Sequence, residues 1–200
     1  MFGPSPTKPD RPGSSIWLGF VPWLVFVVIS RRDTPTAAVV VGLLAAIAVA
    51  IPGIRAGRPK ILELGTVAFF VVFGAIVIAA DPGSHDVLVR YARAFATAGL
   101  ALIAFGSLAL GSPFTEQYAR EQVEESQWSS PAFHAVNRRL TALWGAAFVA
   151  MTCSHVIAGA IDTRRAETIF NWVIPIVLVI VVVKCTEAAR ARAGSRNTPS

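Results

Sequence analysis

Apolar residues dominate six long stretches of this chain, and short segments rich in Gly, Pro and charged residues separate them. The stretches are Ile16–Ile29, Ala37–Ile54, Ile61–Ala80, Val87–Leu110, Leu140–Ile161 and Ile169–Val183. About 20 residues of helix cross the ~30 Å hydrocarbon core of a bilayer, and most of these stretches approach or reach that length. The pattern predicts an all-α fold, a polytopic transmembrane helix bundle of six spans with a short first one.

The longest connection between these stretches runs from Gly111 to Arg139 and has helix signals of its own. Ser112-Pro113 is typical of a helix start, and Glu116 with Arg120 forms an i,i+4 pair. We therefore expect a short interfacial helix over Ser112–Glu124, lying along the membrane surface with its aromatic residues toward the headgroups.

The remaining segments divide the chain into three parts. We expect a disordered Pro-rich leader at 1–15, the helix bundle at 16–186 and a basic disordered tail at 187–200. No small-residue cleavage site follows the first stretch, so we interpret it as an uncleaved helix and not as a signal peptide.

The composition agrees with a membrane protein: 54% of the residues are hydrophobic and 15% are charged. A net charge of +6 would suggest nucleic acid as the partner of a soluble protein. Here the Lys and Arg residues flank apolar stretches, where membrane topology and anionic lipids explain them. We therefore expect membrane lipids, and no nucleic acid, as partners.

The distribution of positive charge predicts an orientation. If all six stretches span, the two termini and the second and fourth connections share one side, which carries twelve of the 18 Lys and Arg residues. The positive-inside bias places that side, and therefore both termini, in the cytoplasm.

The fifth stretch carries a stripe of small and polar residues at helical spacing. Its candidate polar residues are Asn137, Thr141, Thr152 and His155, and Gly145 and Gly159 lie on the same face. Polar groups at membrane depth need partners inside the bundle. One interpretation is close helix packing, with Thr152 and His155 bonded to a neighbouring helix; the other is a proton or solute path lined by His155. Asn171 and Pro175 are candidates for its partner and for a kink.

Arg90 and Arg93 begin the fourth stretch near the membrane boundary. They either reach the headgroups and pair with Asp81 and Asp86, or form an access site for an anionic solute. A solvated face explains the acidic run Glu121, Glu124 and Glu125.

Several reaction classes lack their sequence signals. No nucleophile elbow, phosphate-binding Gly loop or His and Cys spacing of a metal site is present. We therefore expect no catalytic residue, cofactor or metal.

The order of several short motifs resembles the intracellular septation protein A family of bacterial inner-membrane proteins. In the first half these are Phe20-Val21-Pro22, Lys60-Ile61-Leu62-Glu63 and Phe73-Gly74. In the second half they are Ser112-Pro113-Phe114 with Gln117, Trp128, Asn137-Arg138-Arg139-Leu140 with Trp144 and Phe148, and Phe170-Asn171-Trp172-Val173. The resemblance covers about residues 16–186. The leader and the Arg-rich tail depart from the family pattern.

The resemblance implies a multi-pass protein of the bacterial inner membrane. It implies a non-enzymatic role in envelope biogenesis or septation, through contacts with other membrane proteins of the envelope or division machinery. The expected contact surface is the fourth connection with the residues next to it: Phe114, Tyr118, Arg120, Trp128 and Arg138. The alternative is a small transporter of protons or a solute that uses the stripe around His155.

Overall fold

The computed structural model describes residues 16–30 and 35–195, and within these ranges all regular structure is helical. Five of the helical segments are long and apolar enough to cross a membrane. They are Pro35–Arg55, Ile61–Ala79, Ala92–Ala109, Pro131–Ile161 and Arg164–Arg192, and a shorter apolar segment covers Ile16–Ile29. The chain is a multi-pass integral membrane protein with an all-α fold, as the sequence predicted.

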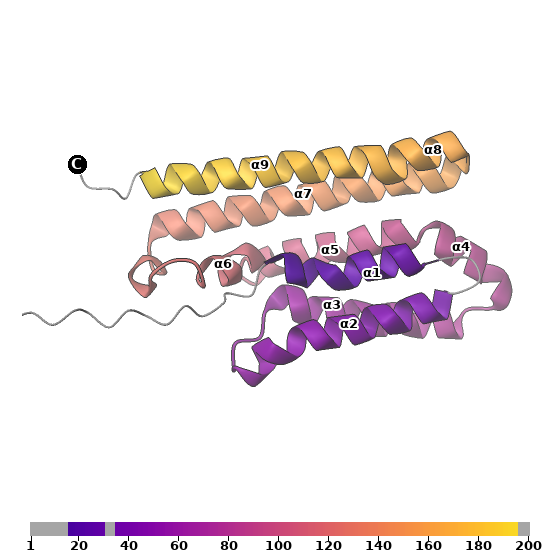
Figure 1. Cartoon of the computed structure of the whole chain (residues 1–200), viewed down its shortest axis with the longest axis horizontal. Coiled ribbons are helices and arrows are strands. Elements are labelled where there is room, and N and C mark those ends of the chain that lie inside the picture. The colour runs from indigo at the N-terminus through magenta and orange to yellow at the C-terminus, as the bar shows by residue number, and fades with distance from the viewer. Residues whose placement is uncertain (1–15, 31–34, 196–200) are drawn as a thin grey trace, which may run out of the picture.

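The first half forms a compact group of three apolar helices. A short 3-10 turn, η1 (Ile16–Phe20), leads into α1 (Val21–Ile29), which packs against α2 (Pro35–Arg55). A turn then reverses the chain into α3 (Ile61–Ala79), which lies beside α2 (Figure 1). The residues of the leader, 1–15, lie outside the described part of the chain.

The fourth apolar stretch is two helices and not the single helix that the sequence predicted. After the turn η2 (Pro82–Ser84), α4 (His85–Arg90) ends at Tyr91, and α5 (Ala92–Ala109) follows. The Tyr91 ring packs on Gly159 of the fifth apolar helix, where a Cβ would lie only 2.5 Å from Tyr91 Cε1. The break therefore coincides with the place where a ring is held against a glycine.

The expected interfacial helix is shorter than the sequence predicted, and it is docked on the bundle. The helix α6 (Phe114–Ala119) has six residues, and a 3-10 turn, η3 (Glu125–Gln127), follows it. Phe114 and Tyr118 are each 1% exposed and point into the bundle, not toward the headgroups. Docking on α5 and α7 buries more of the two rings than a membrane surface would, because packed helices surround them.

The second half consists of two long helices. The helix α7 (Pro131–Ile161) begins nine residues before the predicted apolar stretch. It is followed by α8 (Arg164–Thr168), a π-helical turn η4 (Ile169–Val173) and α9 (Ile174–Ser195). The sequence predicted a disordered tail from residue 187, but α9 continues to Ser195. Ala188, Ala189, Ala191 and Ala193 favour helix, which the basic residues among them do not prevent.

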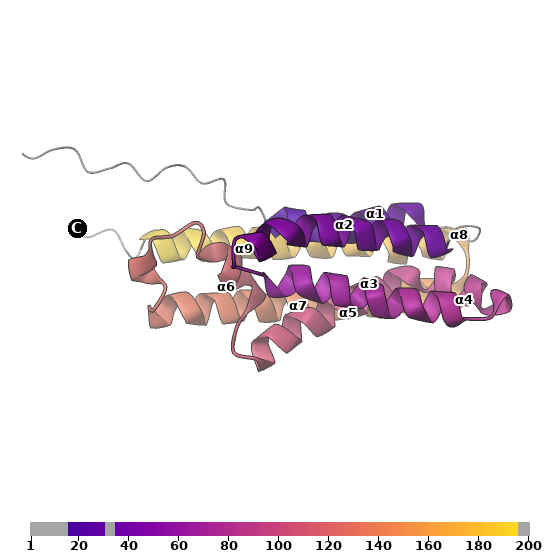
Figure 2. The same cartoon turned by 90° about the horizontal axis from the view of Figure 1, so that it is seen from below.

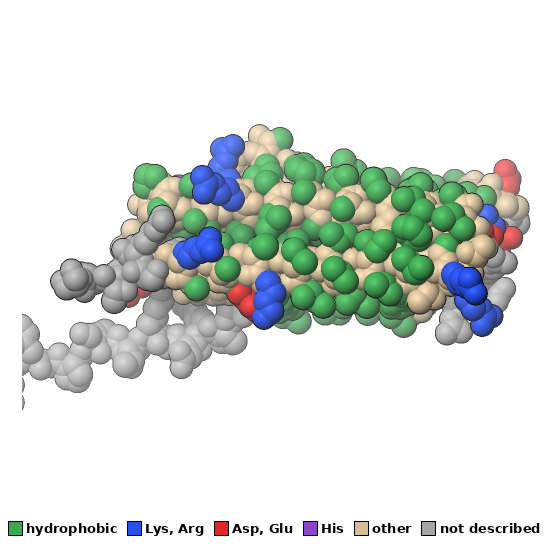
Figure 3. Space-filling model, turned by 90° about the horizontal axis from the view of Figure 1, so that it is seen from above, with side chains coloured by type: hydrophobic (Ala, Val, Ile, Leu, Met, Phe, Trp, Pro, Cys, Tyr) green, Lys and Arg blue, Asp and Glu red, His purple; other side chains and the backbone are tan. Residues whose placement is uncertain are grey.

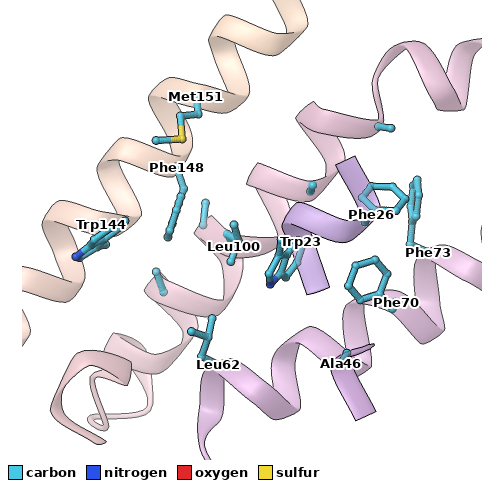
Figure 4. Close-up of a cluster of buried hydrophobic side chains, with 14 of the residues drawn as sticks. Trp23, Phe26, Ala46, Leu62, Phe70, Phe73, Leu100, Trp144, Phe148 and Met151 are labelled. Carbon is cyan, nitrogen blue, oxygen red and sulfur yellow. The ribbon is translucent and has the colours of Figure 1, made fainter. Parts of the chain in front are cut away.

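The helices stack in the order α2, α3, α5, α7 and α9, with α1 against α2 (Figures 1 and 2). Aromatic residues of α1 and α3 form the centre of the core, and Trp144, Phe148 and Met151 of α7 extend it (Figure 4). The Trp23 indole N–H also donates to Thr66 Oγ1 over 3.0 Å. The helix α9 packs mainly on α7. Only 6% of the most apolar part of the segment Arg164–Arg192 is buried, against 50% for α7.

The molecule has two polar ends, which we call the α6 end and the α8 end after the short helix at each. On the face seen in Figure 3, hydrophobic side chains cover the middle, and Lys and Arg side chains lie toward the two ends. The helix α9 ends at the α6 end (Figure 1). The turn η1 lies there too, since a Cβ at Gly19 would meet Leu62 and Tyr118.

Candidate functional site

The candidate site is an open cavity of about 280 Å³ near the α8 end. Its walls come from α1, α5, α7 and the segment formed by η4 and α9. They are lined by Val27, Arg93, Thr97, His155, Asn171, Trp172, Pro175, Ile176, Val179 and Ile180. Most of the wall is apolar, and its polar atoms come from four side chains: Arg93, Thr97, His155 and Asn171.

His155 is bonded to the partner that the sequence suggested. Its Nδ1 lies 2.7 Å from Asn171 Oδ1, and His155 is 6% exposed. An amide oxygen only accepts hydrogen bonds, so Nδ1 carries the proton of this contact. In the neutral ring Nε2 is then an acceptor. The imidazole is therefore held in one orientation on the cavity wall.

The π-helical turn explains how Asn171 reaches His155. Within this turn the N–H of Ile174 donates to the carbonyl of Ile169, five residues back. In the same register the carbonyl of Phe170 would accept from residue 175, which is Pro175 and has no N–H. Ser154 Oγ donates to that carbonyl over 2.6 Å. Pro175 therefore accompanies the local change of register. Ser154 supplies the hydrogen bond that the Phe170 carbonyl cannot receive from residue 175.

Arg93 is the cationic group of the cavity. Its Nη1 lies 3.7 Å from Glu167 Oε1, a long ion pair, and its guanidinium lies 5.3 Å from the centre of the Trp172 ring. The Nε atom is buried and has no hydrogen-bond partner. Arg90, one turn earlier, pairs with Asp162 over 2.8 Å. The expected pairing of the two arginines with Asp81 and Asp86 was therefore wrong, because Asp162 at the end of α7 and Glu167 of α8 are their partners.

Thr152 joins α7 to α5 beside the cavity. Its Oγ1 lies 2.9 Å from Thr97 Oγ1, and both hydroxyls also bond a carbonyl of their own helix. Close packing accompanies this contact, since a Cβ at Gly145 would lie 2.9 Å from Phe105. Thr152 and Gly145 therefore both lie at the contact between α7 and α5.

Asn137 and Thr141 belong to the opposite end of the molecule. Thr115 Oγ1 donates to the carbonyl of Asn137 over 2.9 Å and lies 2.8 Å from Thr141 Oγ1. The predicted stripe therefore divides into two sites: Thr152 and His155 lie near the cavity, whereas Asn137 and Thr141 fix α6 to α7.

A second cluster at the α6 end fixes α6 to the start of α3. Lys60 Nζ lies 2.8 Å from Glu121 Oε1 and 4.1 Å from the centre of the Tyr118 ring. The Tyr118 hydroxyl donates to Glu63 Oε1 over 3.4 Å. Burial, and then the nearby Glu63 carboxylate, raise the pKa of the Tyr118 phenol above its ordinary value. The phenol therefore stays protonated as a donor at neutral pH.

The predicted contact residues divide into buried and accessible ones. Phe114 and Tyr118 are buried, whereas Arg120 and Arg138 are exposed and Trp128 is half-buried. Arg120 bonds Glu116 over 2.6 Å and lies 5.6 Å from the Trp128 ring. His134 Nδ1 contacts the other oxygen of Glu116 at 2.9 Å.

Sequence reasoning missed Glu121 and Glu167 as the partners of Lys60 and Arg93. Each pair is separated by more than sixty residues, so no local spacing connects them. Among the described residues, no three His, Cys, Asp or Glu side chains gather as a metal site would require. The accessible wall of the cavity is almost entirely apolar, and the charge of Arg93 beside it is paired with Glu167.

Comparison of the chain with protein-family models, with curated proteins and with solved structures finds no match.

Proposed function

We propose that this protein is a non-enzymatic component of the bacterial inner membrane that supports envelope biogenesis or septation by contacting other membrane proteins. The family resemblance of its motifs suggests this role. The observation that carries it is the unequal charge of the two ends of the bundle.

Among the described residues, the α6 end is more basic than the α8 end. Among the described residues, nine Lys and Arg side chains and six carboxylates lie toward the α6 end. Of the described residues toward the α8 end, four are arginines and four carry carboxylates: Arg90, Arg93, Arg164 and Arg165, and Asp81, Asp86, Asp162 and Glu167. The sequence also has Arg31, Arg32 and Asp33 between α1 and α2, outside the described residues. An excess of positive charge attracts acidic protein surfaces and anionic lipids and fixes the orientation of a partner.

The backbone that presents these charges is held in place. Three contacts hold α6 and the segment after it against α3 and α7. Gln117 Oε1 accepts from the Ile61 N–H over 2.7 Å, and Lys60 pairs with Glu121. Thr115 Oγ1 donates to the carbonyl of Asn137. Arg190 of α9 donates to Gln122 Oε1 over 3.2 Å. A preorganised surface loses little conformational entropy when it binds, which suits a contact surface. Arg120, Trp128 and Arg138 are its accessible members; Phe114 and Tyr118 support it from inside.

The test replaces two adjacent exposed arginines at one end and compares them with the same pair at the other. Arg138→Ala with Arg139→Ala should lower crosslinking to membrane proteins of the division or envelope machinery and lengthen the cells of the host bacterium. The matched control, Arg164→Ala with Arg165→Ala, removes the same charge from the α8 end and should leave both readouts unchanged. Equal effects of the two double variants, or no effect of either, would contradict the proposal.

A second candidate function is favoured by the cavity around His155. A protonatable ring held by Asn171 beside a cavity of about 280 Å³ is suited to proton or solute movement across the membrane. Purified protein in liposomes should then show flux that His155→Ala abolishes. His134→Ala, a change at the α6 end, is the control. An absence of flux over a broad panel of solutes would remove this candidate and leave the first untouched.

A further inference from the structure

We propose that the cavity near the α8 end binds one hydrocarbon chain of a membrane lipid, which enters sideways from the bilayer between α1 and α9. This assignment goes beyond the contact role proposed above and does not depend on it. It rests on the chemistry of the cavity wall, on the surroundings of the cavity and on its size.

The wall of the cavity has almost no accessible polar surface. The polar groups beside it are already bonded within the protein. His155 Nδ1 is bonded to Asn171. The Thr97 hydroxyl donates to the carbonyl of Arg93, and the Arg93 guanidinium is paired with Glu167. A polar occupant would lose its hydrogen bonds to water on entry without replacing them, so the wall favours an apolar one.

The cavity lies against a part of α9 that faces the hydrocarbon. Ile176 and Ile180 line it and remain 52% and 54% exposed, and Val27 of α1 lines it from another helix. The helix α1 packs mainly on α2, whereas α9 packs mainly on α7, and the cavity lies between the two. Apolar side chains exposed within a span contact acyl chains. A chain of a neighbouring lipid therefore reaches the cavity without crossing a polar layer.

The size of the cavity fits part of one chain and not a whole lipid. Its volume is about 280 Å³. Apolar cavities of ~150 Å³ in proteins stay free of water and admit a molecule of the size of benzene. A space nearly twice as large takes a segment of one acyl chain, and the rest of the lipid remains along the exposed faces of α1 and α9.

The gain on entry comes from dispersion contacts, because the lining of an empty cavity has no partner atoms on one side. The headgroup takes no part in this contact, so the assignment predicts selection by chain and not by charge. A bound chain would also keep water from His155, so the transport candidate requires the cavity to be empty.

The experiment labels the full chain in detergent micelles with a trace of phosphatidylcholine that carries a photoreactive diazirine partway along one acyl chain. Peptide mass spectrometry then locates the label. We expect it on the cavity residues Val27, Ile176 and Val179. Unlabelled phosphatidylcholine should compete at amounts that leave the labelling of Val181, 49% exposed and outside the cavity, unchanged. Phosphatidylglycerol with the same chains should compete equally well.

Two matched pairs of variants test the position of the chain. Ile176→Trp places a ring in the cavity, where it displaces about two methylene groups of the chain, and should lower the labelling of Val27 about tenfold. Val177→Trp, at a neighbouring position that is 51% exposed and outside the cavity, should not lower it. If Ile176→Trp fails to yield a folded, monodisperse protein, Ile180→Trp with Val181→Trp as its control replaces this pair.

Four results would overturn the assignment. Labelling of the cavity no stronger or more easily competed than that of Val181 would show ordinary surrounding lipid only. Unchanged labelling in the cavity-filling variant would place the chain elsewhere. Preferential competition by phosphatidylglycerol would show that the headgroup is bound instead. A dimer in native mass spectrometry that Ile176→Trp dissociates would identify a second copy of the chain as the occupant.

Discussion

Tyr118 shows how one side chain joins distant parts of the chain at the α6 end. Its hydroxyl contacts Glu63, its ring lies under the Lys60 ammonium, and it is 1% exposed. A Cβ at Gly19 of η1 would lie 3.0 Å from the same hydroxyl. The phenol thus touches segments of η1 and α3 from its place on α6.

We expect Tyr118→Phe to lower the free energy of unfolding by about 1 kcal/mol, because it removes a hydrogen bond from a buried carboxylate. The raised pKa of Tyr118 adds a pH dependence. The unfolded-state pKa of Tyr is about 10. Because the folded-state pKa is higher, the buried phenol contributes its full stabilisation below that pH, and this contribution is lost as the pH rises toward the folded-state pKa. Unfolding in detergent at pH 8 and pH 11 measures both effects. The alkaline loss should be smaller in Tyr118→Phe, and an equal loss in both proteins would contradict this account.

Two glycines of α5 provide a second prediction at the same scale. A Cβ at Gly99 would lie 2.5 Å from Phe69 Cδ2 and 3.1 Å from Trp23 Cη2, whereas a Cβ at Gly106 meets nothing within 4 Å. Gly99→Ala should cost about 1–3 kcal/mol through overpacking. Gly106→Ala should be neutral or slightly stabilising, since Ala favours helix over Gly. Thermal unfolding in detergent compares the two, and a similar cost at both positions would contradict the packing argument.

Among the elements, η4 most directly shapes the cavity. The change from α to π register occurs immediately before Pro175 and carries Asn171 onto His155. After the same change of register, the Phe170 carbonyl accepts a hydrogen bond from Ser154 Oγ. Pro175 therefore accompanies the irregular turn, and Ser154 of α7 supplies the hydrogen bond that the turn leaves missing.

This relation predicts a coupling between two positions. Ser154→Ala should destabilise the protein by about 1 kcal/mol, because it leaves a carbonyl unbonded in an apolar environment. In a Pro175→Ala background, residue 175 regains an N–H, and the cost of Ser154→Ala should fall. A double-mutant cycle of unfolding free energies measures the difference. Additive effects would show that Ser154 does not compensate for Pro175.

The sequence predicted the spans better than the ends of the elements. Apolar runs identified α2 and α3 to within a few residues, since their length alone matches the membrane. The break at Tyr91 and the placement of α6 were missed because each depends on a partner far along the chain, Gly159 in one case and Glu63 in the other. His155 was recognised as a polar residue at depth, but the cavity beside it arises only when α1, α5, α7 and α9 come together.

At the scale of the whole molecule, the charge asymmetry predicts sidedness. The described chain begins and ends at the α6 end, which carries the excess of Lys and Arg. The positive-inside rule predicts that this end lies in the cytoplasm. A fluorescent protein fused to the carboxyl terminus should therefore fluoresce, and an alkaline phosphatase fusion at the same place should be inactive. The opposite pair of results would invert the proposed orientation.

The lengths of α7 and of the segment Arg164–Arg192 have a consequence for how the protein meets its surroundings. With 31 and 29 residues, these two helices measure about 45 Å, whereas the hydrocarbon core is ~30 Å thick. They extend past α2 and α3 at the α6 end (Figure 1). Arg138 and Arg190 lie in the polar segments that flank the apolar stretches of these two helices. Since the helices exceed the hydrocarbon core by about 15 Å, a bilayer accommodates this pair by helix tilt and by contact of the flanking Arg residues with the headgroup region.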